Sequence, residues 1–355
     1  MKKKVFIVGP CLSMGGMERA SVNTANALKE EGFEVVFVSI FKKAHFFKLN
    51  NGIVFEDPEG FNTKSLSLLK TVLWIKILIK AHKPQKVLAF NKFYGAITAL
   101  AMMGNKTPFY ISERSSPLFI WEQPIKTINR IAYWLKPPTG VIAQTSIAAS
   151  YQKKYFPKSK IEVIPNILRS VTTYPEIKRR QVILAVGRLG DHLKGFDLLL
   201  KSFAMLKNTD WELHIAGGNE NGQALKDLAL KLGINNRLSF LGKVKDIDTI
   251  YAYAGIYVIP SRSEGFPNAL AEAMAAVCCC VAFDFVAGPQ DMIAHTTNGI
   301  LVENGNINKM AEALDALILN PTLRQQLGEE AKKLADELDA KVISHKIMNF
   351  LELEQ

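Results

Sequence analysis

Short apolar runs alternate with helical patterns along most of this chain, and that alternation limits the possible folds more than any other feature. In the first half, Glu18–Glu31 is a predicted helix, and the predicted strands are KVFIVGP, EVVFVSI, KVLAF, PFYIS, VIAQT and IEVIP. Apolar runs separated by helices are typical of parallel strands joined by crossover helices. The pattern therefore predicts a doubly wound α/β layer.

The periodicity is lost over Ile164–Arg180, which holds two Pro residues and a basic cluster. A second series then begins, with predicted strands at VILAVG, WELHIAG, LSFLG, IYVIP, VCCCVAF and GILVE. The chain has 355 residues, more than one compact core usually holds. We predict two Rossmann-like domains with an interdomain cleft, at residues 1–168 and 181–338, joined by a linker at 169–180.

Positive charge is concentrated in the first half of the chain. Residues 1–170 hold 25 Lys and Arg against 10 Asp and Glu, a net charge of +15. Residues 171–355 hold 19 against 23, a net charge of −4. A basic half suits an anionic partner, and nucleic acid, a membrane surface and a phosphorylated substrate all fit that description.

Cysteine usage and the first residues bear on the compartment. Four Cys, three of them adjacent at Cys278–Cys280, do not form a disulfide framework and favour a reducing cytoplasm. The first apolar run stops at Gly9-Pro10, which makes it too short for a signal peptide. We expect a cytoplasmic chain in which the three adjacent Cys pack as small hydrophobic residues of a buried strand.

The segment SEGFPNALAEAMA offers two carboxylates at the ligand edge of the second predicted sheet. Glu264 follows the run IYVIP, on a loop beyond the carboxyl end of a strand, where ligands bind open α/β sheets. Pro267 suits the first turn of a helix and Asn268 a cap, so a helix is predicted to begin there and to offer amides to phosphate. Glu272 lies about one turn further on, within reach of a sugar hydroxyl. The alternatives are a solvated loop acid at 264 and a favourable first-turn acid at 272.

Two further connections follow predicted strands. In GRLGDHLKG, Arg188 can bind phosphate through two donors and Lys194 supplies a compact charge, so together they suit a diphosphate. In GPCLSMGGMER, Gly15 and Gly16 let the backbone approach a ligand closely, although the segment is neither GxGxxG nor a Walker A loop. A solvated basic loop and a plain tight turn are the respective alternatives.

No metal site is predicted. Asp246 and Asp248 have the spacing of a metal-binding pair, but they precede a helical pattern, where acids serve as caps. The six His residues show no ligand spacing.

Several of these segments together resemble retaining glycosyltransferase family 4. They are GGMER near the start, GRLGDHLKG after the linker, IAGGNEN, LGKV and the segment with two Glu eight positions apart, and they span nearly the whole chain. Members of this family have the GT-B fold and use nucleotide-sugar donors. The resemblance implies a GT-B chain whose last helix, at residues 339–355, crosses back to the first domain.

The resemblance also implies roles for individual residues. Glu264 touches the donor sugar, Glu272 touches the ribose, and Arg188 with Lys194 binds the diphosphate.

Further donor contacts come from three other segments. Val244 neighbours the base, expected to be uracil, and the turn at Gly15 and Gly16 lines the cleft opposite. The start of the predicted helix meets the phosphate with Gly265, Phe266, Pro267, Asn268 and Ala269.

The chain departs from the family pattern in the loop ISERSSP, where many members carry a His. The matching position is Arg114, beside Glu113, and an Arg cannot readily serve as an acid or base near neutral pH. Arg114 is expected to contact the acceptor or the donor phosphate instead.

A basic and aromatic region in the first half suits a lipid headgroup interface. Lys64–Lys83 is a predicted amphipathic helix with Lys76, Lys80 and Lys83 in one sector, and Trp121 and Trp134 follow among further basic residues. Similar polymerising N-acetylgalactosamine transferases have a basic helix here, and that likeness makes Lys70, Lys76 and Lys80 candidates for phosphate contacts. A core helix whose lysines reach solvent is the alternative.

The resemblance implies a retaining, metal-independent glycosyltransferase, cytoplasmic and peripheral on the membrane's inner face. It would move a hexose or N-acetylhexosamine from a nucleotide-sugar, expected to be a UDP-sugar, to a growing lipid-linked glycan. Its partners would be this co-substrate, a glycan or polyprenyl-diphosphate-linked acceptor and an anionic membrane surface, with no cofactor and no nucleic acid. The alternatives are a UDP-sugar epimerase of the same fold and a non-enzymatic basic protein that binds nucleic acid.

Overall fold

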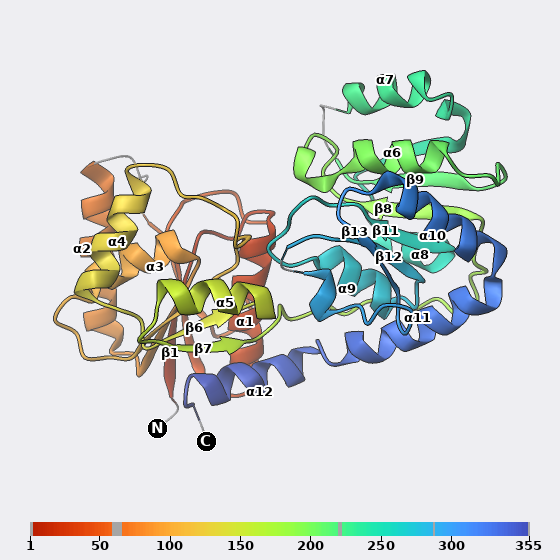
Figure 1. Cartoon of the computed structure of the whole chain (residues 1–355). Helices are drawn as coiled ribbons and strands as arrows, with labels where there is room; N and C mark the ends of the chain where they lie inside the picture. The colour runs from red at the N-terminus through yellow and green to blue at the C-terminus, as the bar shows by residue number, and fades with distance from the viewer. Residues whose placement is uncertain (1–2, 59–65, 219–221, 287, 354–355) are drawn as a thin grey trace. The chain divides into compact units, whose positions relative to one another are not determined.

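A computed structural model of the chain describes residues 3–58, 66–218, 222–286 and 288–353. Its elements form two compact units (Figure 1). The first unit comprises Met1–Ile167 together with Ala340–Gln355, and the second comprises Leu168–Asp339.

Seven parallel strands form the sheet of the first unit, in the order β3-β2-β1-β4-β5-β6-β7. They are β1 (Lys4–Gly9), β2 (Glu34–Ser39), β3 (Val54–Glu56), β4 (Lys86–Phe90), β5 (Phe109–Ser112), β6 (Gly140–Ala143) and β7 (Lys160–Val163). The helices of this unit are α1 (Gly16–Glu30), α2 (Leu66–His82), α3 (Lys92–Ala101), α4 (Ile125–Leu135), α5 (Ser146–Tyr155) and α12 (Ala340–Phe350). In β1, Val5, Phe6, Ile7 and Val8 are fully buried, as expected for a parallel sheet that is covered on both faces.

Six parallel strands form the sheet of the second unit, in the order β10-β9-β8-β11-β12-β13. They are β8 (Val182–Val186), β9 (Glu212–Ala216), β10 (Leu238–Gly242), β11 (Ile256–Ile259), β12 (Cys280–Asp284) and β13 (Ile300–Glu303). The helices are α6 (Phe196–Ala204), α7 (Gln223–Lys231), α8 (Ile247–Tyr253), α9 (Asn268–Ala275), α10 (Ile307–Leu319) and α11 (Pro321–Asp336). Three short 3₁₀ turns complete the unit, namely η1 (His192–Lys194), η2 (Asn235–Arg237) and η3 (Pro289–Asp291).

Both sheets reverse their strand order at one internal pair of neighbours. In the first unit, the pair is β1 and β4, and in the second it is β8 and β11. Ligands of open α/β sheets bind beyond the carboxyl ends of the strands at such a reversal. The loops that follow β8 and β11 carry Arg188, Lys194 and Glu264 of the predicted donor residues.

The predicted fold class, two doubly wound parallel-sheet halves, is confirmed. Some details of the first unit differ from the prediction, and α4 and α5 were not predicted as helices. Helix α1 begins at Gly16, two residues before the predicted start, and the edge strand β3 was not predicted. It has three residues and none is buried, so its apolar signal is short. The predicted start of the Lys64 helix lies outside the described residues, and α2 is described from Leu66.

The segment predicted as a linker is anchored within the second unit, although it contains no helix or strand. The Arg179 guanidinium donates to the carbonyl oxygens of Tyr251 and Ala254 at 2.5 and 2.9 Å and to that of Ala276 at 2.6 Å. These contacts tie the segment to the carboxyl ends of α8 and α9.

Helix α12 belongs to the first unit although it follows the whole second unit in sequence. Its Phe350 ring lies 5.5 Å from the Tyr110 ring on β5. A Cβ at Gly140, the first residue of β6, would lie 2.6 Å from the tip of Phe350. Ile343 and Ile347 of the same helix are buried, so α12 is part of this unit's core.

The three adjacent cysteines are buried at the start of β12, as predicted. Burial raises the pKa of all three thiols, that of Cys279 to about 12. They pack as small hydrophobic residues, and thiolate chemistry near neutral pH is disfavoured at all three.

Candidate active site

Two loops at the carboxyl edge of the second sheet are fixed against each other. One follows β8 and contains η1, and the other follows β11 and leads into α9. The backbone amide of Arg262 donates to the Leu193 carbonyl at 2.8 Å. Gly195 has a φ of 66°, and a Cβ there would lie 1.9 Å from the Pro260 carbonyl oxygen. Glycine is therefore required at 195 for its backbone conformation and for the close approach of the second loop.

Lys194 and Glu264 form an ion pair where these loops meet. The Lys194 Nζ lies 2.9 Å from Glu264 Oε1, and the Ser261 hydroxyl donates to the same oxygen at 2.7 Å. The two charged side chains are 21% and 13% exposed, so water and salt screen them less than a surface pair. A carboxylate accepts hydrogen bonds from sugar hydroxyls and an ammonium neutralises phosphate, so one contact brings both functions together.

Arg188 lies on the same loop as Lys194 but has another partner. Its side chain is 77% exposed and its Nη2 lies 2.8 Å from Asp191 Oδ2. Asp191 also accepts a hydrogen bond from the Leu193 amide and so caps η1. Lys194 is thus paired with Glu264, whereas the Arg188 side chain lies largely in solvent next to Asp191, an acid that was not among the predicted site residues.

Helix α9 begins at Asn268, as predicted, but its cap differs from the expected one. Pro267 occupies the N-cap position, and no side chain caps the helix there. The amide of Asn268 donates to the Phe266 carbonyl, and the amide of Leu270 to the Pro267 carbonyl, both at 2.9 Å. The assignment of Asn268 as a cap was therefore wrong, because the chain turns one residue earlier. Phe266 and Pro267 are buried, whereas Gly265, Asn268 and Ala269 are half-buried.

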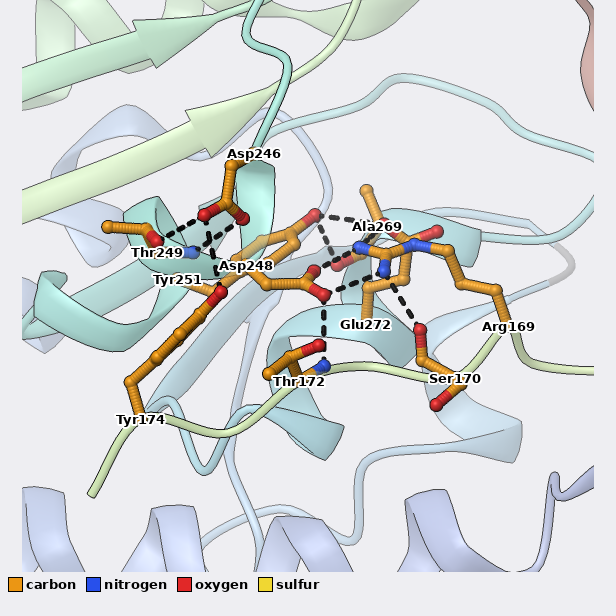
Figure 2. A network of polar contacts seen from close by, with 10 residues as sticks. All are labelled: Arg169, Ser170, Thr172, Tyr174, Asp246, Asp248, Thr249, Tyr251, Ala269 and Glu272. Atoms are coloured by element: carbon orange, nitrogen blue, oxygen red, sulfur yellow. Dashed lines mark hydrogen bonds and ion pairs between the residues drawn. The ribbon is translucent and has the colours of Figure 1, made fainter.

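Glu272 takes part in a polar network one turn into α9 (Figure 2). Its Oε2 lies 3.3 Å from Arg169 Nη2 and 3.4 Å from the Tyr251 hydroxyl. The Arg169 guanidinium also binds Asp248 through two contacts, Nη1–Oδ2 at 3.0 Å and Nη2–Oδ1 at 2.5 Å. Glu272 is buried, so the guanidinium supplies the positive charge that the burial of two carboxylates requires.

The pKa shifts of this network follow from burial and charge together. Burial lowers the pKa of Arg169, but the hydrogen bonds and charges of Asp248 and Glu272 outweigh burial, and the net shift is upward. Burial raises the pKa of Asp248, but Arg169 and the Thr172 amide outweigh it, and the net shift is downward. Both groups are therefore held in their charged forms near neutral pH.

Asp246 and Asp248, the two acids with the spacing of a metal-binding pair, have different contacts in the structure. Asp246 caps α8 by accepting a hydrogen bond from the Thr249 amide at 3.2 Å, which confirms the predicted cap. Asp248 binds Arg169, as described above.

Between β10 and α8, Val244 is half-buried on the loop after Gly242, at the same carboxyl edge as Lys194 and Glu264.

In the first unit, Gly15 and Gly16 lie where α1 begins. Gly15 is the N-cap residue, and a Cβ there would lie 2.1 Å from a Glu18 carboxylate oxygen. A Cβ at Gly16 would meet nothing within 4 Å. The carboxylate is the end of a flexible side chain, so the backbone at this turn does not depend strictly on glycine.

Arg114 lies in a buried polar cluster beyond the carboxyl ends of β4, β5 and β6. Its Nη1 donates to Asn166 Oδ1 at 2.5 Å, and its guanidinium lies 5.6 Å from the centre of the Phe90 ring. Gln144 Nε2 donates to the same Asn166 oxygen at 3.2 Å. The Glu113 carboxylate accepts hydrogen bonds from the backbone amides of Arg114, Ser115 and Lys92.

The cation of this cluster is only partly compensated. Arg114 Nε is buried and has no hydrogen-bond partner among the described residues, and the same holds for Gln144 Oε1. Burial lowers the pKa of Arg114 to about 9, against the opposing charge of Glu113. At neutral pH, the guanidinium therefore remains charged in a poorly solvated position.

Helix α2 exposes lysines and large apolar side chains on the same face. Lys70, Lys76 and Lys80 are exposed, and so are Leu69, Leu73 and Ile77, which recur every fourth residue. Lys83 comes after the helix ends. The lysines are thus interleaved with apolar groups, whereas the prediction grouped Lys83 with Lys76 and Lys80.

Among the described residues, no helix is both long enough and apolar enough to cross a membrane.

A second exposed apolar group lies on α4 and the loop before it. Trp134 is 81% exposed and Ile120 is 78% exposed, with Leu118, Phe119 and Ile131 also exposed. Helices α2 and α4 both pack against α3. The tryptophans here were predicted from the sequence, whereas the exposed apolar loop at 118–120 was not.

Comparisons with known proteins match this organisation across both units. The model of the family described as Glycosyltransferase Family 4 matches residues 14–168, and the model described as Glycosyl transferases group 1 matches residues 172–334. An uncharacterized glycosyltransferase of Haemophilus influenzae is 30% identical over 95% of this chain and 96% of its own length. The chain belongs to glycosyltransferase family 4. It is a glycosyltransferase with the GT-B fold.

Two further similar proteins extend the comparison. A Campylobacter jejuni protein is 27% identical over 97% of this chain and 96% of its own length. Its name describes an α-1,4-N-acetyl-D-galactosaminyltransferase acting on a glycan linked to undecaprenol through a diphosphate. The crystal structure of Anabaena HepE in complex with UDP superposes with a TM-score of 0.83, at 19% identity, over 99% of this chain and 100% of that one. That likeness supports the same fold.

Proposed function

We propose that this glycosyltransferase moves a hexose or N-acetylhexosamine from a UDP-sugar to a growing, lipid-linked surface glycan, with retention of configuration and without a metal. The observation that carries the proposal is the Lys194–Glu264 pair beside α9, at the reversal of strand order in the second unit. A carboxylate and a cation held together at this edge of the sheet are groups that suit a sugar diphosphate, which supports the proposal. The name of the Campylobacter jejuni relative supports the lipid-linked acceptor.

The second unit supplies the donor contacts in this proposal. Glu264 accepts hydrogen bonds from the sugar hydroxyls, and Glu272 accepts them from the ribose. Lys194 neutralises the diphosphate, and Arg188, whose exposed side chain can turn from Asp191, adds a second cation. Val244 borders the base, and the residues from Gly265 to Ala269 approach the phosphates.

The chemical step needs no nucleophile from the protein. The acceptor oxygen attacks the anomeric carbon on the face from which the diphosphate leaves, and its proton passes to the leaving phosphate oxygen. One C–O bond forms as another breaks. Lys194 stabilises the charge that develops on the diphosphate, and the fixed loops orient the sugar.

The first unit supplies the acceptor side. Arg114 is a buried cation whose charge suits an acceptor phosphate, and Lys70, Lys76 and Lys80 suit the diphosphate of a polyprenyl carrier or anionic headgroups. Exposed apolar side chains between these lysines favour a peripheral position on an anionic membrane surface.

The donor assignment is tested by a thermal-shift and turnover panel of UDP-, GDP- and ADP-sugars, each with and without EDTA. UDP-sugars are expected to stabilise the protein by about 2.7 kcal/mol at a hundredfold excess over Kd, with no effect of EDTA. Preferential stabilisation by GDP- or ADP-sugars would contradict the UDP assignment. If the protein converts the UDP-sugar to its epimer in the absence of an acceptor, the proposed transferase activity is wrong and the protein is an epimerase.

The membrane assignment is tested by reversing charge on α2. Lys76→Glu with Lys80→Glu is expected to weaken binding to phosphatidylglycerol-containing vesicles about tenfold or more, since each basic residue near the surface contributes about 1 kcal/mol. Lys226→Glu with Lys231→Glu on α7 makes the same charge change in the second unit and is the control. Cosedimentation measures both. Equal losses of vesicle binding in the two double variants would mean that binding depends only on the net charge of the protein and not on α2.

A further inference from the structure

Arg169 is held in a fixed position beside Glu272 by contacts from several directions (Figure 2). Both of its terminal nitrogens bind Asp248, at 3.0 and 2.5 Å. Two-point contacts of this kind fix the plane of a guanidinium as well as its distance. The contact of Nη2 with Glu272 Oε2, at 3.3 Å, therefore comes from a group with little freedom to move.

The backbone that carries Arg169 is anchored at the same place. The Thr172 amide donates to Asp248 Oδ2 at 2.9 Å, and the Tyr174 hydroxyl lies 3.2 Å from Asp246 Oδ2. Asp246 and Asp248 belong to the start of α8, which is itself capped by Asp246. The irregular segment 169–174 is thus tied to a helix end by contacts with two carboxylates.

Two of the donors that contact Glu272 approach the same carboxylate oxygen. Arg169 Nη2 and the Tyr251 hydroxyl both approach Oε2, at 3.3 and 3.4 Å. A carboxylate has acceptor capacity on both oxygens, and holding one of them fixes the direction of the other. Contacts of this kind pre-organise a binding group and reduce the entropy lost when its ligand arrives.

We propose that Arg169 is a positioning residue for nucleotide binding. It orients the Glu272 carboxylate toward the ribose hydroxyls, with Asp248 holding the guanidinium in place. The inference rests on the proposed ribose contact of Glu272. It adds a residue from the segment that joins the two units to the donor site, where the sequence suggested only a basic linker.

The test compares UDP with 2′,3′-dideoxy-UDP, which lacks both ribose hydroxyls. Wild-type protein is expected to bind UDP at least tenfold more tightly than the dideoxy analogue. In Arg169→Gln, this ratio is expected to fall to about threefold or less, because the hydroxyls then meet a poorly oriented carboxylate. Arg169→Lys keeps the charge but loses the two-point contact, so its ratio should be intermediate.

Two further variants separate positioning from general stability. Asp248→Asn keeps Arg169 but weakens its anchor, so it should also lower the ratio. Arg179→Gln removes another arginine of the same segment, one that binds only the carbonyl oxygens at the ends of α8 and α9 and the Cys278 sulfur in the contacts described. It is expected to lower Tm while the ratio stays at the wild-type value.

The outcomes distinguish this inference from the proposed function. A wild-type ratio in folded Arg169→Gln and Asp248→Asn would overturn the positioning role while leaving the ribose contact intact. If wild-type protein binds UDP and its dideoxy form equally, the ribose role of Glu272 fails, and the positioning role fails with it. A fall of the ratio in Arg179→Gln equal to that in Arg169→Gln would also overturn the inference, since any loosening of the segment would then suffice.

Discussion

Replacing Glu264 by Gln is expected to lower kcat by about 10²–10³-fold while the Kd for UDP changes by less than about threefold. Gln keeps the shape of the side chain but removes the charge that pairs with Lys194 at 2.9 Å. The proposed role of Glu264 is to hold the transferred sugar, which free UDP lacks. Turnover should therefore fall while nucleotide binding persists.

The measurement is steady-state transfer together with UDP titration of the same preparation. Glu330→Gln is the matched control, because Glu330 also pairs with a lysine, Lys333, but on the exposed surface of α11. Surface pairs of this kind contribute little, so the control should keep the wild-type rate. A wild-type rate in Glu264→Gln would show that the donor sugar binds elsewhere.

Replacing Lys194 by Met is expected to lower kcat/KM by about 10²–10³-fold and, unlike the Glu264 change, to weaken UDP binding. The ammonium is proposed to neutralise the diphosphate both in the bound donor and as the sugar leaves. Uridine has no phosphate, so its affinity should change little. The contrast between UDP and uridine, measured by calorimetry, isolates the phosphate contact.

Two comparisons complete the Lys194 test. Lys201→Met on α6 removes an exposed lysine from the helix that follows the same loop and should leave both affinities unchanged. The double variant with Glu264→Gln should lose less activity than the two single losses combined, because the residues act through one contact. Equal weakening of UDP and uridine in Lys194→Met would point to a distorted loop instead of a lost phosphate contact.

The elements that could be predicted from the sequence are those whose signal is local. Continuous apolar runs mark the buried strands, and the order of strands and loops places Lys194 and Glu264 at carboxyl ends. The start of α9 at Asn268 was predicted because Pro267 favours a helix start, although it lies at the cap and not in the first turn. The burial of Cys278–Cys280 follows from the strand that they enter.

The contacts that escaped prediction depend on distant parts of the chain. Arg169 lies 79 residues from Asp248 and 103 from Glu272, and its segment shows only loss of periodicity and positive charge. Arg188 was grouped with Lys194 because both cations lie on one loop. In the structure, Arg188 pairs with Asp191 of that loop, whereas Lys194 pairs with Glu264 of another. Spacing in sequence predicts which edge a residue occupies, but not its partner there.

The place of α12 has a consequence for the order in which the protein is made. Residues 340–353 are translated only after the entire second unit, yet the first unit uses them to cover Tyr110 and to fill the space beside Gly140. During synthesis, the ribosome adds more than 170 further residues before the segment that covers this apolar surface is made. A nascent chain in that condition is a natural client for chaperones, and a fragment ending near Ile167 inherits the same exposed surface permanently.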